Sequence, residues 1–159
     1  MIFNKNSSIK LITALVTAIT LGCQKRPEAP GFSLEEDTKK VKAILKRIDT
    51  HIGDTSIYAA DVVHMAQGSR AITNKAQLYK VLAAEAAYGH SDMTHELVTI
   101  HAYQEMVLTR GRVKGSWHAG DGRKSFPFET NNIITFRRMK DGSLKVWQVI
   151  FNRVELEKY

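Results

Sequence analysis

The chain has 159 residues, of which 43% are hydrophobic and 25% charged, and this balance is typical of one globular domain. It excludes a disordered, collagen-like or multi-span membrane chain. The formal net charge of +7 brings an anionic partner into consideration, whether a nucleic acid, a membrane surface or an acidic ligand, and the single cysteine excludes an internal disulfide.

The first 22 residues have the layout of a secretory signal peptide. Lys5 and Lys10 supply positive charge without any acid, and the apolar run 11–21 follows them. This run is shorter than the roughly 20 apolar residues that a membrane-spanning helix needs. We therefore expect residues 1–22 to be cleaved off.

The apolar run ends in Thr20-Leu21-Gly22-Cys23, which resembles the lipobox of bacterial lipoproteins. The resemblance implies cleavage before Cys23 and acylation of its thiol, which would anchor the protein to a bacterial membrane; an ordinary signal peptide or an uncleaved anchor is the alternative. Residues 23–33 would then be the lipidated cysteine and a tether, and residues 34–159 the folded domain. Gln24 is similar to the outer-membrane sorting signal of Gram-negative lipoproteins, so we expect an exported protein on the outer membrane that faces the periplasm.

Two helices are predicted from their capping residues and apolar spacing. Ser33 and Glu36 form a capping-box pattern ahead of apolar residues at helical spacing, which predicts a helix from Leu34 to about Thr50. Asn74 with Gln77 three residues on indicates a second helix start, and this helix ends at Gly89.

A short strand and four long strands complete the predicted domain. The short strand covers residues 62–66, and the long ones are 91–102, 106–117, 126–139 and 144–154. Asp121-Gly122 and Asp141-Gly142 between long strands are typical of two-residue hairpin turns. The order predicts an α+β fold in which a bent antiparallel sheet of four long strands carries helices on one face.

Three segments carry a resemblance to a known superfamily. Ile57-Tyr58-Ala59-Ala60-Asp61 before the first strand and the closing segments 139–146 and 150–152 are similar to the nuclear transport factor 2-like superfamily, and within it to the SnoaL-like domains. The resemblance covers most of residues 34–153. It implies a cone-shaped roll around an apolar pocket, often a homodimer through the sheet, and activities that range from ketosteroid isomerisation and polyketide cyclisation to binding without chemistry. Many relatives place an acid shortly before the final Phe-Asn; this chain has Val149 there, so the role of that acid is not carried over.

Metal and nucleophile motifs are weak in this sequence. His95-Glu96 begins a zincin-like motif, but Thr99 stands where the second histidine is required. His95 and His101 share a predicted strand face yet lie about 20 Å apart, too far for one ion. A metal site would need residues from other strands, so we expect no metal and no cofactor. No Gly-x-Ser-x-Gly elbow surrounds Ser116.

General acid–base chemistry needs only one or two polar groups in an apolar pocket. Candidates for it are Tyr58, Asp61, His64, Tyr88, His95, His101, Asn132 and Asn152. Each of them also has an ordinary structural explanation. The predicted ligand-binding residues are Tyr58, His64, Tyr88, Trp117, Asn132 and Trp147, and the apolar wall is predicted to draw on Val63, Leu82, Trp117, Ile134 and Trp147.

Cations alternate along one strand, at Arg110, Arg112 and Lys114, which predicts that they face solvent. More cations lie near the last hairpin, at Arg137, Arg138, Lys140 and Lys145. A solvated surface beside anionic lipid explains them better than nucleic-acid binding, because few aromatic residues are interleaved with them.

Two classes of function remain open. The first is a membrane-anchored domain that binds a small apolar ligand or a protein partner without catalysis. The alternative is an isomerase, cyclase or dehydratase in which a buried acid or histidine moves a proton. A pocket that holds a carboxyl or imidazole with a shifted pKa would favour the enzyme.

Overall fold

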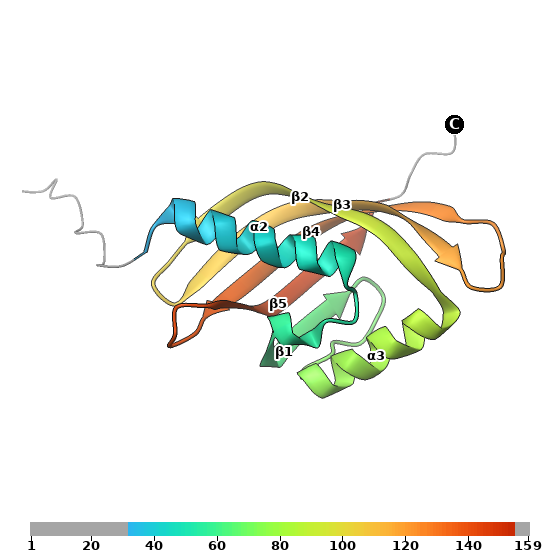
Figure 1. The fold of residues 1–159 in the computed structure, drawn as a ribbon, viewed down its shortest axis with the longest axis horizontal. Helices are drawn as coiled ribbons and strands as arrows, with labels where there is room; N and C mark the ends of the chain where they lie inside the picture. Colours follow the sequence, from blue (N-terminus) through green and yellow to red (C-terminus); the bar gives the residue numbers. More distant parts are fainter. Residues whose placement is uncertain (1–31, 155–159) are drawn as a thin grey trace, which may run out of the picture. The chain divides into compact units, whose positions relative to one another are not determined.

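A computed structural model describes residues 32–154 (Figure 1). The elements in chain order are α2 (Leu34–Thr50), the short 3-10 helix η1 (Thr55–Ile57), β1 (Tyr58–Ala66), α3 (Lys75–Tyr88), β2 (Gly89–Ala102), β3 (Met106–Ala119), β4 (Phe126–Arg138) and β5 (Leu144–Arg153). The predicted signal peptide and Cys23 lie outside the described residues. Within residues 32–154, the helices lack the length and apolarity that crossing a membrane requires.

The strands of the described region form one curved sheet in the order β1-β5-β4-β3-β2 (Figure 1). From β2 to β5, each strand pairs antiparallel with the next, whereas β1 lies parallel to β5 at the edge. The predicted α+β class with four long antiparallel strands is confirmed. β1 begins four residues before the predicted strand 62–66 and joins the same sheet as a fifth strand.

Local hydrogen bonds fix the predicted helix starts and hairpin turns. The side chain of Ser33 accepts from the Glu36 backbone N–H at 3.4 Å, and Asn74 does the same for Gln77 at 2.9 Å. Gly122 and Gly142 have φ of +75° and +76°, a conformation that glycine adopts without a Cβ clash. Both connections are longer than the predicted two-residue turns, running over 120–125 and 139–143.

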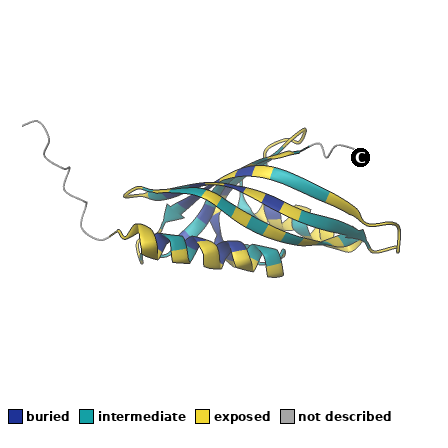
Figure 2. Ribbon diagram, turned by 90° about the horizontal axis from the view of Figure 1, so that it is seen from above, coloured by how far each residue is buried: buried dark blue, intermediate teal, exposed yellow. Residues whose placement is uncertain are grey.

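The core lies between α2 and the concave face of the sheet. α2 turns Val41, Ile44 and Leu45 toward the sheet, together with the buried carboxylate of Asp37, and exposes residues of its opposite face to solvent (Figure 2). On the sheet side, Phe136 and Val146 are fully buried in the same cluster. Burial of these side chains supplies most of the driving force that holds α2 on the sheet, because each contributes about 1.5–3 kcal/mol.

α3 is packed much less tightly than α2. Its only fully buried residue is Leu78, while Tyr79, Val81 and Tyr88 are exposed. The helix contacts β1 and β2 at one end of the sheet (Figure 1). This loose packing leaves a space between α3, the end of α2 and the sheet.

Two irregularities in the strand register decide which side chains face that space. In β2 the pairing with β3 shifts between Leu97 and Thr99, and in β5 the pairing with β4 shifts at Trp147. One extra residue in a strand reverses the alternation of faces beyond it. His95 and His101 therefore lie on opposite faces, contrary to the prediction that they share one.

Candidate active site

A cavity of about 210 Å³ lies between the C-terminal end of α2, α3 and the concave face of the sheet. Most of its lining is apolar: Ile48, Ile52, Leu82, Met93, Val113, Phe128, Ile134, Val149 and Phe151. Polar groups also reach the cavity, from Tyr58, His64, Glu85, His95, Thr130 and Asn132. An apolar space with a few convergent polar groups is the usual form of a small-molecule site.

One residue of this lining, His95, is paired with Asp49 of α2. His95 Nδ1 is 2.6 Å from Asp49 Oδ1, and the same carboxylate accepts from the His95 backbone N–H at 3.2 Å. The two side chains are 9% and 17% exposed. With Nδ1–H donating to Asp49, the neutral ring carries its lone pair on Nε2. The pair can therefore offer Nε2 to a molecule in the cavity as a proton acceptor.

Asn132 places an unused hydrogen-bond donor in the same lining. Its side chain is buried, and Nδ2 has no hydrogen-bond partner among the described residues. Gly111 is directly opposite Asn132 in the β3–β4 register, and a Cβ there would meet the Asn132 Oδ1 at 3.0 Å. A buried donor without a partner costs about 1–3 kcal/mol, so a ligand oxygen that accepts from Nδ2 recovers this energy.

Burial shifts three titratable groups of the lining. It raises the pKa of Tyr58 to about 12, with a smaller contribution from the charge of Asp54, so the phenol stays protonated at neutral pH. Burial also lowers the pKa of His64 and holds its imidazole neutral. Glu85 lines the cavity but is exposed overall, and partial burial raises the pKa of its carboxyl. Tyr58 and His64 are therefore neutral polar groups in the cavity at neutral pH.

The structure brings together some of the predicted ligand-binding residues and separates others. Tyr58, His64 and Asn132 line the cavity, with Leu82 and Ile134 in its apolar wall. Outside the lining lie Val63, Tyr88, Trp117 and Trp147. The prediction that all the ligand-binding and wall residues line one cavity is therefore wrong for these four residues.

Each of the separated aromatic residues has a local reason for its place. Tyr88 is the last residue of α3 and is 76% exposed. Trp117 packs beyond the cavity, where a Cβ on Gly89 would meet its ring at 2.8 Å. Trp147 lies at the register shift of β5 and holds the Arg137 guanidinium 4.1 Å from its ring centre.

Other acid–base candidates lie away from the cavity. Asp61 makes a bidentate ion pair with Arg137, at 2.8 and 2.9 Å, and this hydrogen bonding lowers its pKa. His101 and Asn152 are exposed. These three residues take no part in the candidate site.

The predicted cationic surface is confirmed on β3 and corrected near the last hairpin. Arg110, Arg112 and Lys114 are all exposed. Arg138 instead points into the core side, 8% exposed, and donates to both oxygens of Asp37, which is 2% exposed. The register of β4 sends Arg138 inward beside Phe136, where only a paired cation is tolerated.

Asp49 and Glu85 were missed from the sequence. Asp49 stands in the last turn of a helix most of whose other charged residues face solvent, and Glu85 lies in an alanine-rich stretch of α3. Asp49 meets His95 only because α2 crosses β2, 46 residues further along the chain. No local pattern signals such a contact.

Comparisons with known proteins bear on the fold. No family model matches the chain, and no curated protein matches it. A ketosteroid isomerase-like protein from Erwinia carotovora atroseptica is similar in structure, with a TM-score of 0.67 and 18% identity over 79% of this chain and 100% of that chain. A nuclear transport factor 2-like superfamily protein from Salmonella enterica has a TM-score of 0.60 and 13% identity, over 79% and 96% of the two chains. A scytalone dehydratase-like protein from Novosphingobium aromaticivorans has a TM-score of 0.63 and 11% identity, over 79% and 87%. The chain therefore has the nuclear transport factor 2-like fold.

Proposed function

We propose that the cavity binds a small, largely apolar molecule that carries a carbonyl or hydroxyl oxygen, and that His95 with Asp49 moves a proton on it. The reaction class is isomerisation or dehydration. The observation that carries this proposal is the buried His95–Asp49 pair, which opens into an apolar cavity. Fold neighbours described as ketosteroid isomerase-like and scytalone dehydratase-like support it.

The pair and Asn132 divide the chemistry between them. His95 Nε2 takes a proton from a carbon next to the carbonyl, and Asp49 stabilises the imidazolium that forms. Asn132 Nδ2 donates to the substrate oxygen as negative charge develops on it. His95 returns the proton to another carbon in an isomerisation, or to a departing hydroxyl in a dehydration, so the enzyme ends each cycle unchanged.

Binding without chemistry is the second candidate function. The unpartnered Nδ2 of Asn132 and the apolar lining are sufficient to hold a ligand. Ligand binding alone does not require the His95–Asp49 pair. The His95 Nε2 makes no hydrogen bond to the described residues, so the structure alone does not account for the pair. This pair is the reason that the catalytic proposal is preferred.

Exchange of the α-protons of cyclohexanone in deuterated water, followed by NMR, tests proton removal without knowledge of the natural substrate. We expect the protein to accelerate exchange, and His95→Gln to lower the acceleration by about 10²–10⁴-fold, the usual contribution of a general base. Asp49→Asn should lower it by about 10²-fold or more, because the neutral amide no longer stabilises the imidazolium. The measurement is the exchange rate at equal protein concentration.

His101→Gln is the matched control, since His101 lies on the same strand but is exposed and faces away from the cavity. It should leave the exchange rate unchanged. Thermal shift with cyclohexanone reports binding separately. Binding by the wild-type protein, with an exchange rate equal to that of His95→Gln, would contradict the catalytic proposal and support the binding domain.

A further inference from the structure

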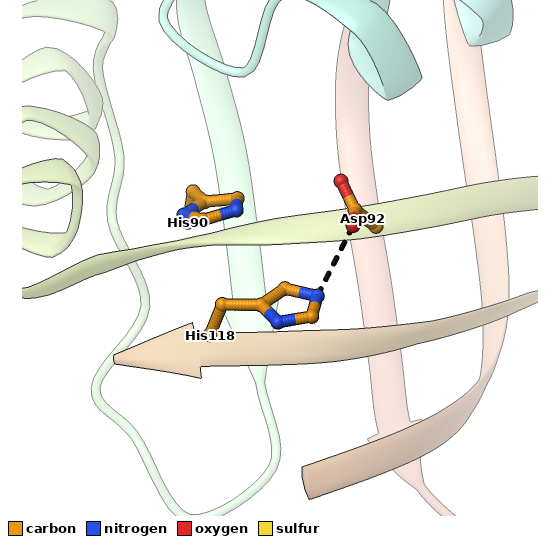
Figure 3. Close-up of side chains that lie close together, drawn as sticks. All are labelled: His90, Asp92 and His118. Atoms are coloured by element: carbon orange, nitrogen blue, oxygen red, sulfur yellow. Dashed lines mark ion pairs between the residues drawn. The ribbon is translucent and has the colours of Figure 1, made fainter. Parts of the chain in front are cut away.

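A cluster of potential metal ligands lies on the sheet face opposite the cavity. Met93 and His95 of β2 line the cavity, so the alternation of side chains sends His90 and Asp92 to the other face. His118 of β3 lies on that same face, directly opposite His90 in the β2–β3 register (Figure 3). The antiparallel pairing thus places two imidazoles and one carboxylate side by side.

The ligand atoms of the three side chains lie within 4.8 Å of one another. The His90 and His118 rings are stacked, with centres 4.9 Å apart, and His118 Nε2 lies 3.1 Å from Asp92 Oδ2. Ligand atoms bound to one tetrahedral zinc ion are about 3.3 Å apart, given bond lengths of about 2.0–2.2 Å. His90 and Asp92 are exposed, so their side chains can rotate and bring the ligand atoms from within 4.8 Å of one another to the shorter separation that zinc requires.

The hydrogen bonding of His118 is a second observation that points to a cation. Its Nδ1 lies 2.7 Å from the Ser125 hydroxyl. Its Nε2 is buried and has no hydrogen-bond partner among the described residues, because the approach of Asp92 lies off the hydrogen-bond direction. When Nδ1–H donates to Ser125, Nε2 carries a lone pair 3.1 Å from a carboxylate oxygen, which is unfavourable unless a cation lies between them.

We propose that His90, Asp92 and His118 bind a divalent transition-metal ion, with zinc as the best fit. Two imidazole nitrogens and one carboxylate oxygen suit zinc, and the outward-facing site leaves the fourth position open to water. Ser125 acts as the outer partner that orients His118. The ion links the first residues of β2 to the last residues of β3. This site lies next to Gly89, where α3 ends and β2 begins.

Lys114 limits how tightly such an ion is held. It lies with Asp92 and His118 around the same open surface groove. Its positive charge opposes a divalent cation at short range. We therefore expect reversible binding that depends on all three ligands.

The test is calorimetric titration of the full chain with zinc chloride, without a histidine tag and with Cys23→Ser so that the thiol does not compete. We expect one ion per chain. His118→Gln, Asp92→Asn and His90→Gln should each weaken binding by more than about tenfold, and Ser125→Ala by about tenfold. His101→Gln, on the exposed part of the same strand, should bind zinc as the parent does.

Imidazole NMR gives a readout that does not rest on the variants folding. Zinc should shift the ring nitrogens of His90 and His118 and leave those of His51 and His101 unchanged. Absence of zinc binding, or equal affinity in the parent and the three ligand variants, would overturn the proposal. The 3.1 Å separation would then be an ordinary polar contact between the Asp92 and His118 side chains.

Discussion

At the scale of single residues, the buried His64 of the cavity makes the stability of the domain depend on pH. Burial holds its folded-state pKa below the ordinary value of 6.5, so the unfolded chain takes up the proton first as pH falls. The stability that neutral His64 contributes is therefore present above pH 6.5 and is lost as pH falls toward the lowered pKa. We expect His64→Gln to lose less unfolding free energy than the wild type on acidification. Denaturant unfolding between about pH 5 and 8 measures this slope.

The His64 test compares how steeply the free energy of unfolding changes with pH in the two proteins. Any loss of stability that the substitution causes equally at every pH does not affect this comparison. His101→Gln is the control, because His101 is exposed and should leave the wild-type slope unchanged. Identical slopes for wild type and His64→Gln would show that the imidazole is as well solvated in the folded state as in the unfolded chain.

At the scale of elements, one buried ion pair attaches the first turn of α2 to the end of β4. Asp37 and Arg138 meet through two hydrogen bonds of 2.8 and 2.7 Å. We expect Asp37→Asn to lower the free energy of unfolding by about 3–5 kcal/mol, because it leaves the Arg138 charge buried without its partner. The double variant Asp37→Leu with Arg138→Met should lose less, since it buries no unpaired charge. Urea unfolding of both variants measures the difference.

A second ion pair, between β1 and β4, serves as a matched control for this prediction. Arg137 and Asp61 make a similar bidentate contact, but their side chains are 34% and 59% exposed. Asp61→Asn should cost about 1 kcal/mol or less, because solvent screens the pair. If Asp37→Asn and Asp61→Asn lowered the free energy of unfolding equally, burial of the Asp37–Arg138 pair would not increase its contribution to stability.

At the scale of the whole molecule, we propose that the domain is held on a bacterial membrane through acylated Cys23, the only cysteine of the chain. Two or more acyl chains give stable anchoring, because each buried methylene contributes about 0.8 kcal/mol. We expect Cys23→Ala to move the protein from the membrane fraction to the soluble fraction of a Gram-negative host, or to block its processing. Fractionation and intact-mass analysis measure both effects. A native protein that retains residues 1–22 and a free Cys23 thiol would contradict this proposal.

Much of the fold was predictable because its signals are local. The caps at Ser33 and Asn74 are hydrogen bonds to backbone groups three residues away, so the sequence alone locates both helix starts. Gly122 and Gly142 mark their hairpins because only glycine adopts positive φ at little cost. Alternation within β3 likewise exposes Arg110, Arg112 and Lys114, since the period of a strand is two.

The contents of the candidate site depended on contacts that no local pattern encodes. Tyr58, His64 and Asn132 could be anticipated as cavity residues, but the pairing of Asp49 with His95 depends on where α2 crosses the sheet. The register shift at Trp147 turned a predicted pocket wall outward. A one-residue shift reverses every face beyond it, and sequence periodicity does not reveal where the shift occurs.

The sequence by itself therefore determined the helices, the long strands, the positions of the hairpins and the fold class, because these follow from residue propensities, caps and periodicity over a few neighbours. Tertiary structure alone decided which polar groups meet. It joined Asp49 to His95 across 46 residues, and it set His90 opposite His118 through the β2–β3 register. The angle at which a helix crosses a sheet and the register of two strands are set by packing of the whole core. Chemistry that needs two side chains in contact is fixed only when that core forms.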